Sequence, residues 1–240
     1  TWLPAQPGTD GAMAMAMGHV MLKEFFVDRR VPFFVDYVQR YTDLPFLVTL
    51  QERDGAHVPG KFLTAADLGE DGEGAEWRTV LVDGRTGEPV VPNGSLGFRH
   101  TPSGAGRWNL DLGDVTPQLT LHGGDAAEVL LPRFDALDGT GGVLRRGVPV
   151  RRVAGKLVTT VFDLMLAQYG VHRDGLPGTW PAGYDDATEP YTPAWQEAIT
   201  SVPAEQVTRV AREMARNSEE SDGKTMIIMG AGICQWFHGD

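Results

Sequence analysis

Two glycine-containing bends, one near each end of the 240-residue chain, carry residue types suited to binding a phosphorylated ligand. The first is Pro7-Gly8-Thr9-Asp10, directly before a run of helix-forming residues. Glycine lets a ligand approach the backbone, and the following helix offers free N–H groups and a positive dipole end to an anion. Gly-Thr-Asp at this place is also an ordinary helix cap, so both interpretations stay open.

The second bend is Gly230-Ala231-Gly232-Ile233-Cys234-Gln235, which follows the apolar run 225–229. Ligands of α/β layers collect at the carboxyl ends of strands, so this bend is a candidate ligand site. It begins like the dinucleotide fingerprint Gly-x-Gly-x-x-Gly, but Gln235 stands at the third glycine position. A nicotinamide-dinucleotide site is therefore a disfavoured alternative.

Other residues of chemically reactive types are more simply interpreted as structural. The six histidines show no metal-ligand spacing, and we expect His19 to be a hydrogen-bonded core residue. Cys234 is the single cysteine, which excludes an internal disulfide and favours a small buried thiol. The pairs Arg145-Arg146 and Arg151-Arg152 are expected to be solvated or paired with acids.

Composition narrows the class of protein. Asp and Glu number 32 against 21 Lys and Arg, a net charge of −11 that argues against binding nucleic acid or an anionic lipid surface. Hydrophobic residues make up 42%, enough for a real core. No uncharged apolar run approaches the roughly 18 residues of a membrane span. These features predict a globular, acidic protein.

The chain separates into three zones by composition. Residues 1–50 have a helical pattern and are interpreted as the helical end of a first α/β domain. Residues 51–150 are interpreted as a Gly/Pro-rich insertion with short β-hairpins, because 18 of the 30 glycines lie between Gly55 and Gly147. Residues 151–240 regain regular structure and are interpreted as the start of a second α/β domain.

Hydrophobic periodicity and capping residues predict the elements within these zones. In chain order we expect a helix around 12–17 buried on nearly all sides, a helix over 32–41, a hairpin of 79–82 with 89–91, a helix over 158–169 ended by Gly170, helices opening at Thr192-Pro193 and at Pro203, and a buried strand over 225–229. Helix, strand and glycine turn in this order predict an α/β fold made of partial doubly wound layers.

The ends of the sequence suggest a longer parent. The chain opens on Thr1 without a signal-peptide core, and it closes a few residues after an expected core strand. We therefore expect an internal piece of a longer polypeptide.

Several segments resemble one family. Trp2-Leu3-Pro4, the bend 7–10 and the run 12–20 look like the molybdopterin oxidoreductase (DMSO reductase) superfamily, and within it the catalytic α subunits of membrane-bound respiratory nitrate reductases. Further similar segments lie along the chain at 37–45, 59–67, 91–95, 158–170, 191–195 and 226–238. The resemblance covers nearly all 240 residues, with gaps mainly in 100–155.

This resemblance implies a cofactor and the residues near it. The family holds molybdenum in two molybdopterin guanine dinucleotides, and by motif match Gly8, Thr9 and Asp10 line the nucleotide end of one of them. Ala231 and Gln235 carry over as cofactor neighbours near the pterin. The ligands of a [4Fe-4S] cluster and of the metal lie outside this chain, so it holds neither catalytic residue nor metal ligand. Cys234-Gln235 departs from the family's usual Asn-His, which leaves the surroundings of the metal open.

The resemblance also implies an activity for the whole subunit. It would reduce nitrate to nitrite by oxygen-atom transfer, with electrons from an iron–sulfur β subunit and a haem-bearing membrane γ subunit, on the cytoplasmic side of the membrane. The 240-residue chain alone is expected to be inactive and to self-associate through exposed apolar surface. Two alternatives stay open: a nicotinamide-dependent enzyme domain and a non-catalytic scaffold. The choice between nitrate, chlorate and a related oxyanion also stays open.

Overall fold

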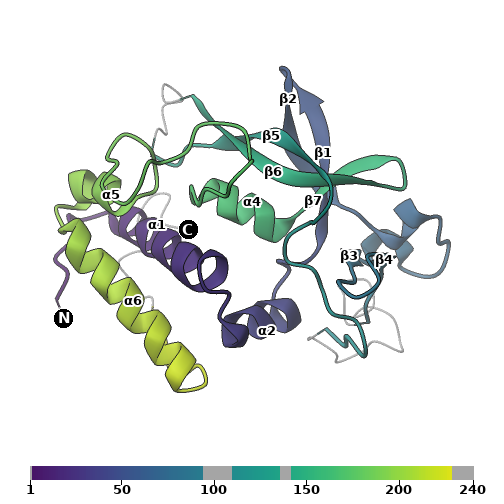
Figure 1. Ribbon diagram of the computed structural model, residues 1–240, viewed down its shortest axis with the longest axis horizontal. Helices are drawn as coiled ribbons and strands as arrows, with labels where there is room; N and C mark the ends of the chain where they lie inside the picture. The colour runs from purple at the N-terminus through teal and green to yellow at the C-terminus, as the bar shows by residue number, and fades with distance from the viewer. Residues whose placement is uncertain (1, 94–109, 136–141, 229–240) are drawn as a thin grey trace.

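The computed structural model describes residues 2–93, 110–135 and 142–228. Its elements are, in chain order, α1 (Asp10–Met21), the π-helical turn η1 (Leu22–Val27), α2 (Pro32–Tyr41), β1 (Leu47–Arg53), β2 (Ala56–Phe62), the 3₁₀ turns η2 (Ala65–Leu68) and η3 (Ala75–Trp77), β3 (Leu81–Val82), β4 (Pro89–Val90), β5 (Asp125–Pro132), β6 (Val143–Val153), β7 (Lys156–Thr160), α4 (Val161–Gln168), α5 (Pro193–Thr200) and α6 (Ala204–Glu220). Figure 1 shows α1, α5 and α6 gathered on one side, the strands on the other and α4 between them. No helix in the described ranges is long and apolar enough to cross a membrane.

Five strands close into a barrel in the order β1-β2-β5-β6-β7. All neighbouring pairs are antiparallel except β2 and β5, which meet in parallel at His57 and Val129. An apolar cluster joins the barrel to α4 and α5; its buried members are Leu50, Val129, Leu131, Leu144, Val148, Val150, Ala167, Tyr191 and Trp195. The barrel therefore shares one apolar cluster with α4 and α5.

Several expected elements are confirmed. Helix α2 has the predicted bounds, and α5 begins after Thr192, whose hydroxyl accepts from Trp195 N. The hairpin expected around residues 83–87 is the antiparallel pair β3 and β4. Gly170 follows α4 with a φ of 75°, a left-handed conformation that glycine adopts without penalty. Mixed α/β content, the fold class indicated by the sequence, is likewise confirmed.

Three local expectations were wrong. Val158 lies in β7 rather than in a helix, because the Thr160 hydroxyl accepts from Asp163 N and starts α4 only at Val161. Helix α1 is not buried on nearly all sides: Ala16, His19 and Val20 are buried, whereas Ala14 is exposed.

The third concerns the expected strand at 225–229. Residues 225–228 are not in a strand, and Met226, Ile227 and Ile228 are 72–80% exposed. A strand needs a neighbour to satisfy its backbone N–H and C=O groups, and no strand of the described ranges pairs with this segment. Met229 lies outside the described residues.

The two boundaries between the three composition zones fall inside strands of the barrel. Residue 50 falls inside β1 and residue 150 inside β6, and both strands belong to the same barrel. The barrel therefore draws strands from all three zones. The division into 1–50, 51–150 and 151–240 stays a prediction about the parent protein.

Arg146 is fully buried on the inner face of β6, between Leu144 and Val148. Its guanidinium donates to five acceptors: Ala167 O (2.8 Å), Gln168 O (3.0 Å), Thr179 O (3.3 Å), Pro190 O (2.6 Å) and Glu189 Oε2 (3.4 Å). Burial lowers the pKa of Arg146, and the Glu189 carboxylate opposes this shift. One cation therefore ties the barrel to the end of α4 and to the loop that follows it. Of the two expected states, solvated or paired with an acid, Arg146 shows the second, because Glu189 is its partner.

Two glycines bring that loop against β6. Gly147 N donates to Pro177 O, and Thr179 N donates to Arg145 O. A Cβ on Gly147 would overlap Pro177, and a Cβ on Gly178 would overlap the backbone of Arg145. The close approach therefore requires glycine on both sides, and it places Thr179 O beside the Arg146 guanidinium.

Farther along the same loop, Asp186 organises a turn. Its carboxylate accepts from the backbone N–H groups of Ala182, Thr188 and Glu189 and from the Thr188 hydroxyl. These hydrogen bonds lower the pKa of Asp186 to about 2. The turn precedes Glu189 and Pro190, so it orders the acceptors that Arg146 uses.

We predict that Arg146→Met destabilises the protein by about 3–5 kcal/mol, because it leaves buried carbonyls without donors. The matched control is Arg145→Met, whose side chain is 45% exposed and pairs with Glu128 on the other face of β6. That change should cost no more than about 1 kcal/mol. Urea unfolding measures both, and equal losses would contradict a structural role for Arg146.

The lowered pKa of Asp186 predicts that the stability of the fold decreases at acid pH. Its pKa is lower in the folded state than its usual value of about 4, so its contribution is complete above about pH 4 and is lost as pH falls through about 2. The melting temperature of the wild type should therefore fall more steeply than that of Asp186→Asn between these values. Asp185→Asn, a change at the exposed neighbouring acid, should keep the wild-type slope. Parallel curves for the wild type and Asp186→Asn would sink this explanation.

Candidate functional site

The first candidate bend lies at the exposed N-terminus of α1. Gly8 has a φ of 78°, a left-handed conformation that turns the chain into the helix. Thr9 is the N-cap, but its hydroxyl donates to Gln6 O (2.6 Å) and caps no helical N–H. The first N–H groups of α1 therefore have no side-chain acceptor. A Cβ on Gly11 would meet no atom within 4 Å, so the first turn faces open space.

Neighbouring elements hold this bend in place. Gln6 N donates to Thr200 O (2.9 Å), the last residue of α5, and so fixes the irregular segment before Gly8. Behind it, Ala16 packs with Val202 and Val207, which joins α1 to the start of α6. The bend is thus rigidly positioned although Gly8 and Asp10 are themselves exposed.

The second half of the sequence-predicted site falls in 229–240. Ala231 and Gln235, with Cys234 and His238, lie outside the described residues. The distance between the two bends is therefore not part of what the structure describes, and their pairing in one site stays a prediction.

His19 confirms its expected structural role. It is 3% exposed, and its Nδ1 donates to Tyr169 O (2.7 Å) at the end of α4. Burial lowers the pKa of His19, against the effect of that hydrogen bond. One residue earlier, a Cβ on Gly18 would overlap the Tyr169 ring, so glycine is needed for α1 to pack there.

The sequence did not predict a partly buried ion pair between α6 and the π-helical turn η1. Arg212 Nη2 and Nε donate to the two carboxylate oxygens of Glu24 (2.7 and 2.9 Å), and the Tyr184 hydroxyl donates to Glu24 as well (2.9 Å). Burial alone would raise the pKa of Glu24, but the bonds from Arg212 and Tyr184 lower it. The helical spacing of apolar residues predicted α6, but it did not predict that Arg212 pairs with Glu24, because the two lie 188 residues apart in sequence.

A cavity of about 580 Å³ lies beside α1. It is lined by His19, Lys23, Val27, Asp28, Gly170, His172, Arg173, Asp174, Pro181, Ala182, Gly183 and Tyr184. Two cationic residues, Lys23 and Arg173, and two acidic ones, Asp28 and Asp174, line it, and Lys23 donates to Asp28 (2.7 Å). Charge alone therefore selects neither an anion nor a cation there.

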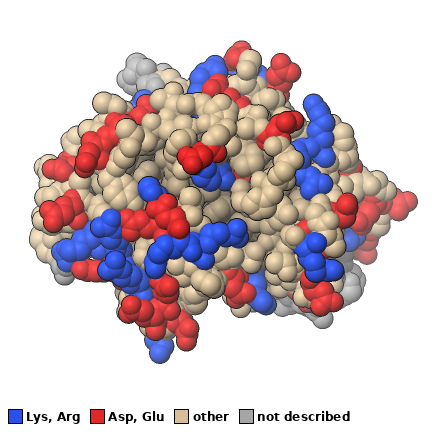
Figure 2. Space-filling view, in the orientation of Figure 1, with Lys and Arg blue, Asp and Glu red and all other residues tan. Residues whose placement is uncertain are grey.

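The surface in view carries charges of both signs. Figure 2 shows Lys and Arg side chains interspersed with Asp and Glu over one face. Within the ranges that the structure describes, no three His, Cys, Asp or Glu residues gather closely enough to hold a metal ion. The exposed start of α1 stays the sequence-predicted candidate for an anionic ligand.

Similarity to known proteins identifies the family of this chain. The family model "Molybdopterin oxidoreductase" matches residues 1–240. The chain is 59% identical to a nitrate reductase alpha subunit of Mycobacterium tuberculosis, 45% to a respiratory nitrate reductase 1 alpha chain of Escherichia coli and 41% to a nitrate reductase alpha chain of Bacillus subtilis. Each match covers the whole chain but only 20–21% of the relative. The chain thus spans about a fifth of the length of these relatives, and it belongs to the molybdopterin oxidoreductase family.

Proposed function

We propose that this chain is part of the catalytic subunit of a molybdenum nitrate reductase, which reduces nitrate to nitrite by oxygen-atom transfer. The observation that carries the proposal is the 59% identity to a nitrate reductase alpha subunit over the full 240 residues. The chemistry belongs to the family's molybdenum–pterin cofactor, which supplies the oxygen-accepting and electron-accepting centre when bound. This chain contributes binding surface to that centre and no catalytic side chain.

Gly8, Thr9 and Asp10 are proposed to hold the nucleotide end of one molybdopterin guanine dinucleotide. The fit rests on three features of the bend: Gly8 has no side chain in the way, the Thr9 hydroxyl caps no N–H group although Ala12 N donates to Thr9 O, and a Cβ on Gly11 would meet open space. Uncapped N–H groups suit a diphosphate. The exposed Asp10 carboxylate suits the N–H donors of a guanine edge.

Ala231 and Gln235 are proposed as neighbours of the pterin. Alanine leaves room for a ring, and a side-chain amide offers both a donor and an acceptor to it. Gln235 at this position also argues against the alternative of a nicotinamide-dinucleotide domain, whose fingerprint needs glycine there. The other alternative, a non-catalytic scaffold, requires that the full-length protein purify without molybdenum.

The proposed partners are those that the family resemblance implies. A [4Fe-4S] cluster held outside this chain, an iron–sulfur β subunit and a haem-bearing γ subunit would deliver electrons to the full-length protein. Its place would be peripheral, at the cytoplasmic side of the membrane, through those partners. The exposed Met226, Ile227 and Ile228 support the expectation that the isolated chain self-associates.

The activity is tested on the full-length protein with a reduced artificial electron donor. Purified protein should contain molybdenum and form nitrite from nitrate, whereas the 240-residue chain alone should form none because it lacks most of the cofactor enclosure. Comparing kcat/KM for nitrate and chlorate decides the substrate preference. Nitrite formation by the isolated chain, or full-length protein free of molybdenum, would contradict the proposal.

The site is tested by Asp10→Ala in the full-length protein. Losing a charged acceptor should weaken retention of the guanine dinucleotide by about tenfold or more. Guanine nucleotide released by acid, measured per protein after gel filtration, reports this without relying on activity. Asp71→Ala, at another exposed acid, is the control and should retain the wild-type content. Full guanine content in Asp10→Ala would remove Asp10 from the site.

A further inference from the structure

The bend before α1 is a turn fastened to the end of α5. Residues 6–9 form this turn, with proline second and a left-handed glycine third, and the hydrogen bond from Thr9 N to Gln6 O (3.2 Å) closes it. Gln6 N in turn donates to Thr200 O (2.9 Å), and Gln6 Nε2 donates to Ser201 Oγ (3.3 Å). Gln6 therefore joins the turn to the junction between α5 and α6.

The residue that supplies this acceptor is itself held by a buried network. Thr200 is fully buried, and its hydroxyl donates to Gln196 Oε1 (2.7 Å) and accepts from Val202 N (3.0 Å). Gln196 is also fully buried, and its Nε2 donates to Val202 O (2.8 Å). Every polar side-chain atom of Thr200 and Gln196 thus has a partner. A buried polar network that is fully satisfied makes its surroundings rigid.

The same junction ends α5 at Thr200. Ser201 has a left-handed φ of 63°, and its N–H donates to Glu197 O (2.9 Å). Ala204 N, four residues after Thr200, donates to the Glu197 side chain (2.8 Å) and not to the Thr200 carbonyl. The chain therefore turns into α6 instead of continuing α5. The carbonyl of Thr200 stays available to Gln6, as the last carbonyls of a helix generally are to outside donors.

Apolar packing holds the same segments together. Leu3 and Ala5, which precede the turn, pack against the buried cluster of Ala16, Val202 and Val207. This cluster joins the first residues of the chain, α1 and the start of α6. Two independent sets of contacts, one polar and one apolar, therefore determine where the first turn of α1 lies.

We propose that Thr200 and Gln196 are positioning residues for the bend that carries Gly8 and Asp10. By fixing the carbonyl to which Gln6 is bonded, they set the angle at which the bend meets the guanine dinucleotide. Both are fully buried, so they act through Gln6 and do not contact the ligand. The inference rests on the proposed function of the bend. Binding depends on this placement because hydrogen bonds weaken steeply with distance and angle.

The first test is Thr200→Val in the full-length protein. The change keeps the volume nearly constant but leaves Val202 N and Gln196 Oε1 without their partner. Guanine content per protein, followed over time in urea below the unfolding transition, should fall about three to ten times faster, the factor that one hydrogen bond contributes. Thr200→Ser keeps the hydroxyl and should lose guanine at the wild-type rate.

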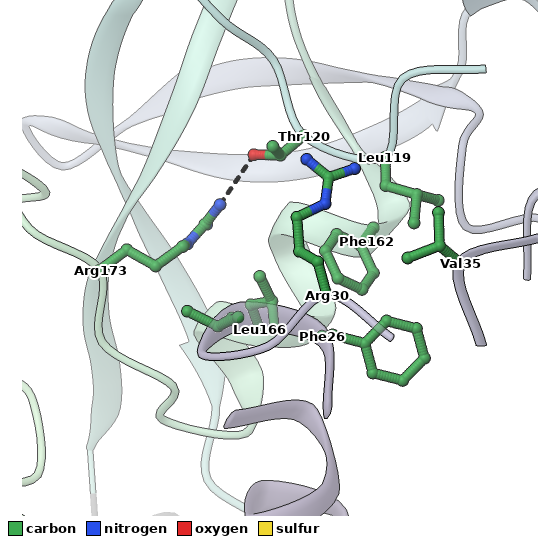
Figure 3. Close-up of a pocket in the computed structure, with 9 residues that line it drawn as sticks. Phe26, Arg30, Val35, Leu119, Thr120, Phe162, Leu166 and Arg173 are labelled. Carbon is green, nitrogen blue, oxygen red and sulfur yellow. Dashed lines mark hydrogen bonds between the residues drawn. The ribbon is translucent and has the colours of Figure 1, made fainter. Parts of the chain in front are cut away.

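Thr120→Val is the matched control for the loss of a threonine hydroxyl. Thr120 Oγ1 also donates once and accepts once, to Asp163 Oδ1 (2.6 Å) and from Arg173 Nη1 (2.8 Å). Figure 3 shows this hydroxyl bonded to Arg173 beside a hollow of about 140 Å³, which no residue of 2–9 or of α5 lines. The control should lower the melting temperature but keep the wild-type rate of guanine loss. Equal acceleration in the two valine variants would overturn the proposal.

A second measurement separates the positioning role from the cofactor site. Hydrogen–deuterium exchange should be faster in Thr200→Val for a peptide covering residues 3–12 and unchanged for one covering 143–153 of β6. Unchanged exchange at 3–12 would overturn the positioning role even where Asp10→Ala has lost its guanine. Full guanine content in Asp10→Ala would instead overturn the proposed function of the bend, and this inference with it, whatever the exchange shows.

A milder variant keeps the question open to test if Thr200→Val fails to fold by circular dichroism. Gln6→Ala removes the exposed hydrogen bond to Ser201 and leaves the core intact. It should accelerate both guanine loss and exchange at 3–12 by about twofold, the lower limit for one hydrogen bond. Wild-type values for both quantities in Gln6→Ala would then reject the proposal.

Discussion

The fold depends on one buried cation. Arg146 points inward from β6 and places its guanidinium among carbonyls of α4 and of the loop beyond it. Two of these acceptors, Ala167 O and Gln168 O, belong to the last turn of α4, where the helix dipole is negative, and Ala167 O also accepts from Gly170 N. A single positive charge thus adds donors at the end of α4 and fixes that end against the barrel.

The position of the candidate site at the start of α1 depends on this contact of Arg146 with α4. With the end of α4 fixed, Tyr169 presents its carbonyl to His19 and its ring to Gly18, which sets how α1 lies on the barrel side. Arg212 and Glu24 then join α6 to the turn after α1. The bend at Gly8 is therefore held both by its own hydrogen bonds, from Gln6 N to Thr200 O and from Thr9 to Gln6 O, and by the packing of α1 farther along the helix.

Local signals and distant contacts differ in how far the sequence reveals them. The caps and proline at Thr192-Pro193, the periodicity of α6 and the turn at 83–87 act within a few residues, and they predicted α5, α6 and the β3–β4 hairpin. Closure of the barrel through β2 and β5 joins segments about 70 residues apart, and no local pattern encodes it. Arg146 lies between these cases, because alternation with Leu144, Val148 and Val150 along β6 places it on the buried face.

The two halves of the proposed cofactor site differ in what shapes them. Gly8, Thr9 and Asp10 are formed by contacts inside the described fold, so this half is preorganised for a ligand. The other half follows residues 225–228, whose apolar side chains are exposed and whose backbone pairs with no described strand. A run of this composition is stable as a strand when strands flank it and both faces are covered. Ala231 and Gln235 lie outside the described residues, so their half of the site stays a prediction, whereas the bend at α1 is part of the described fold.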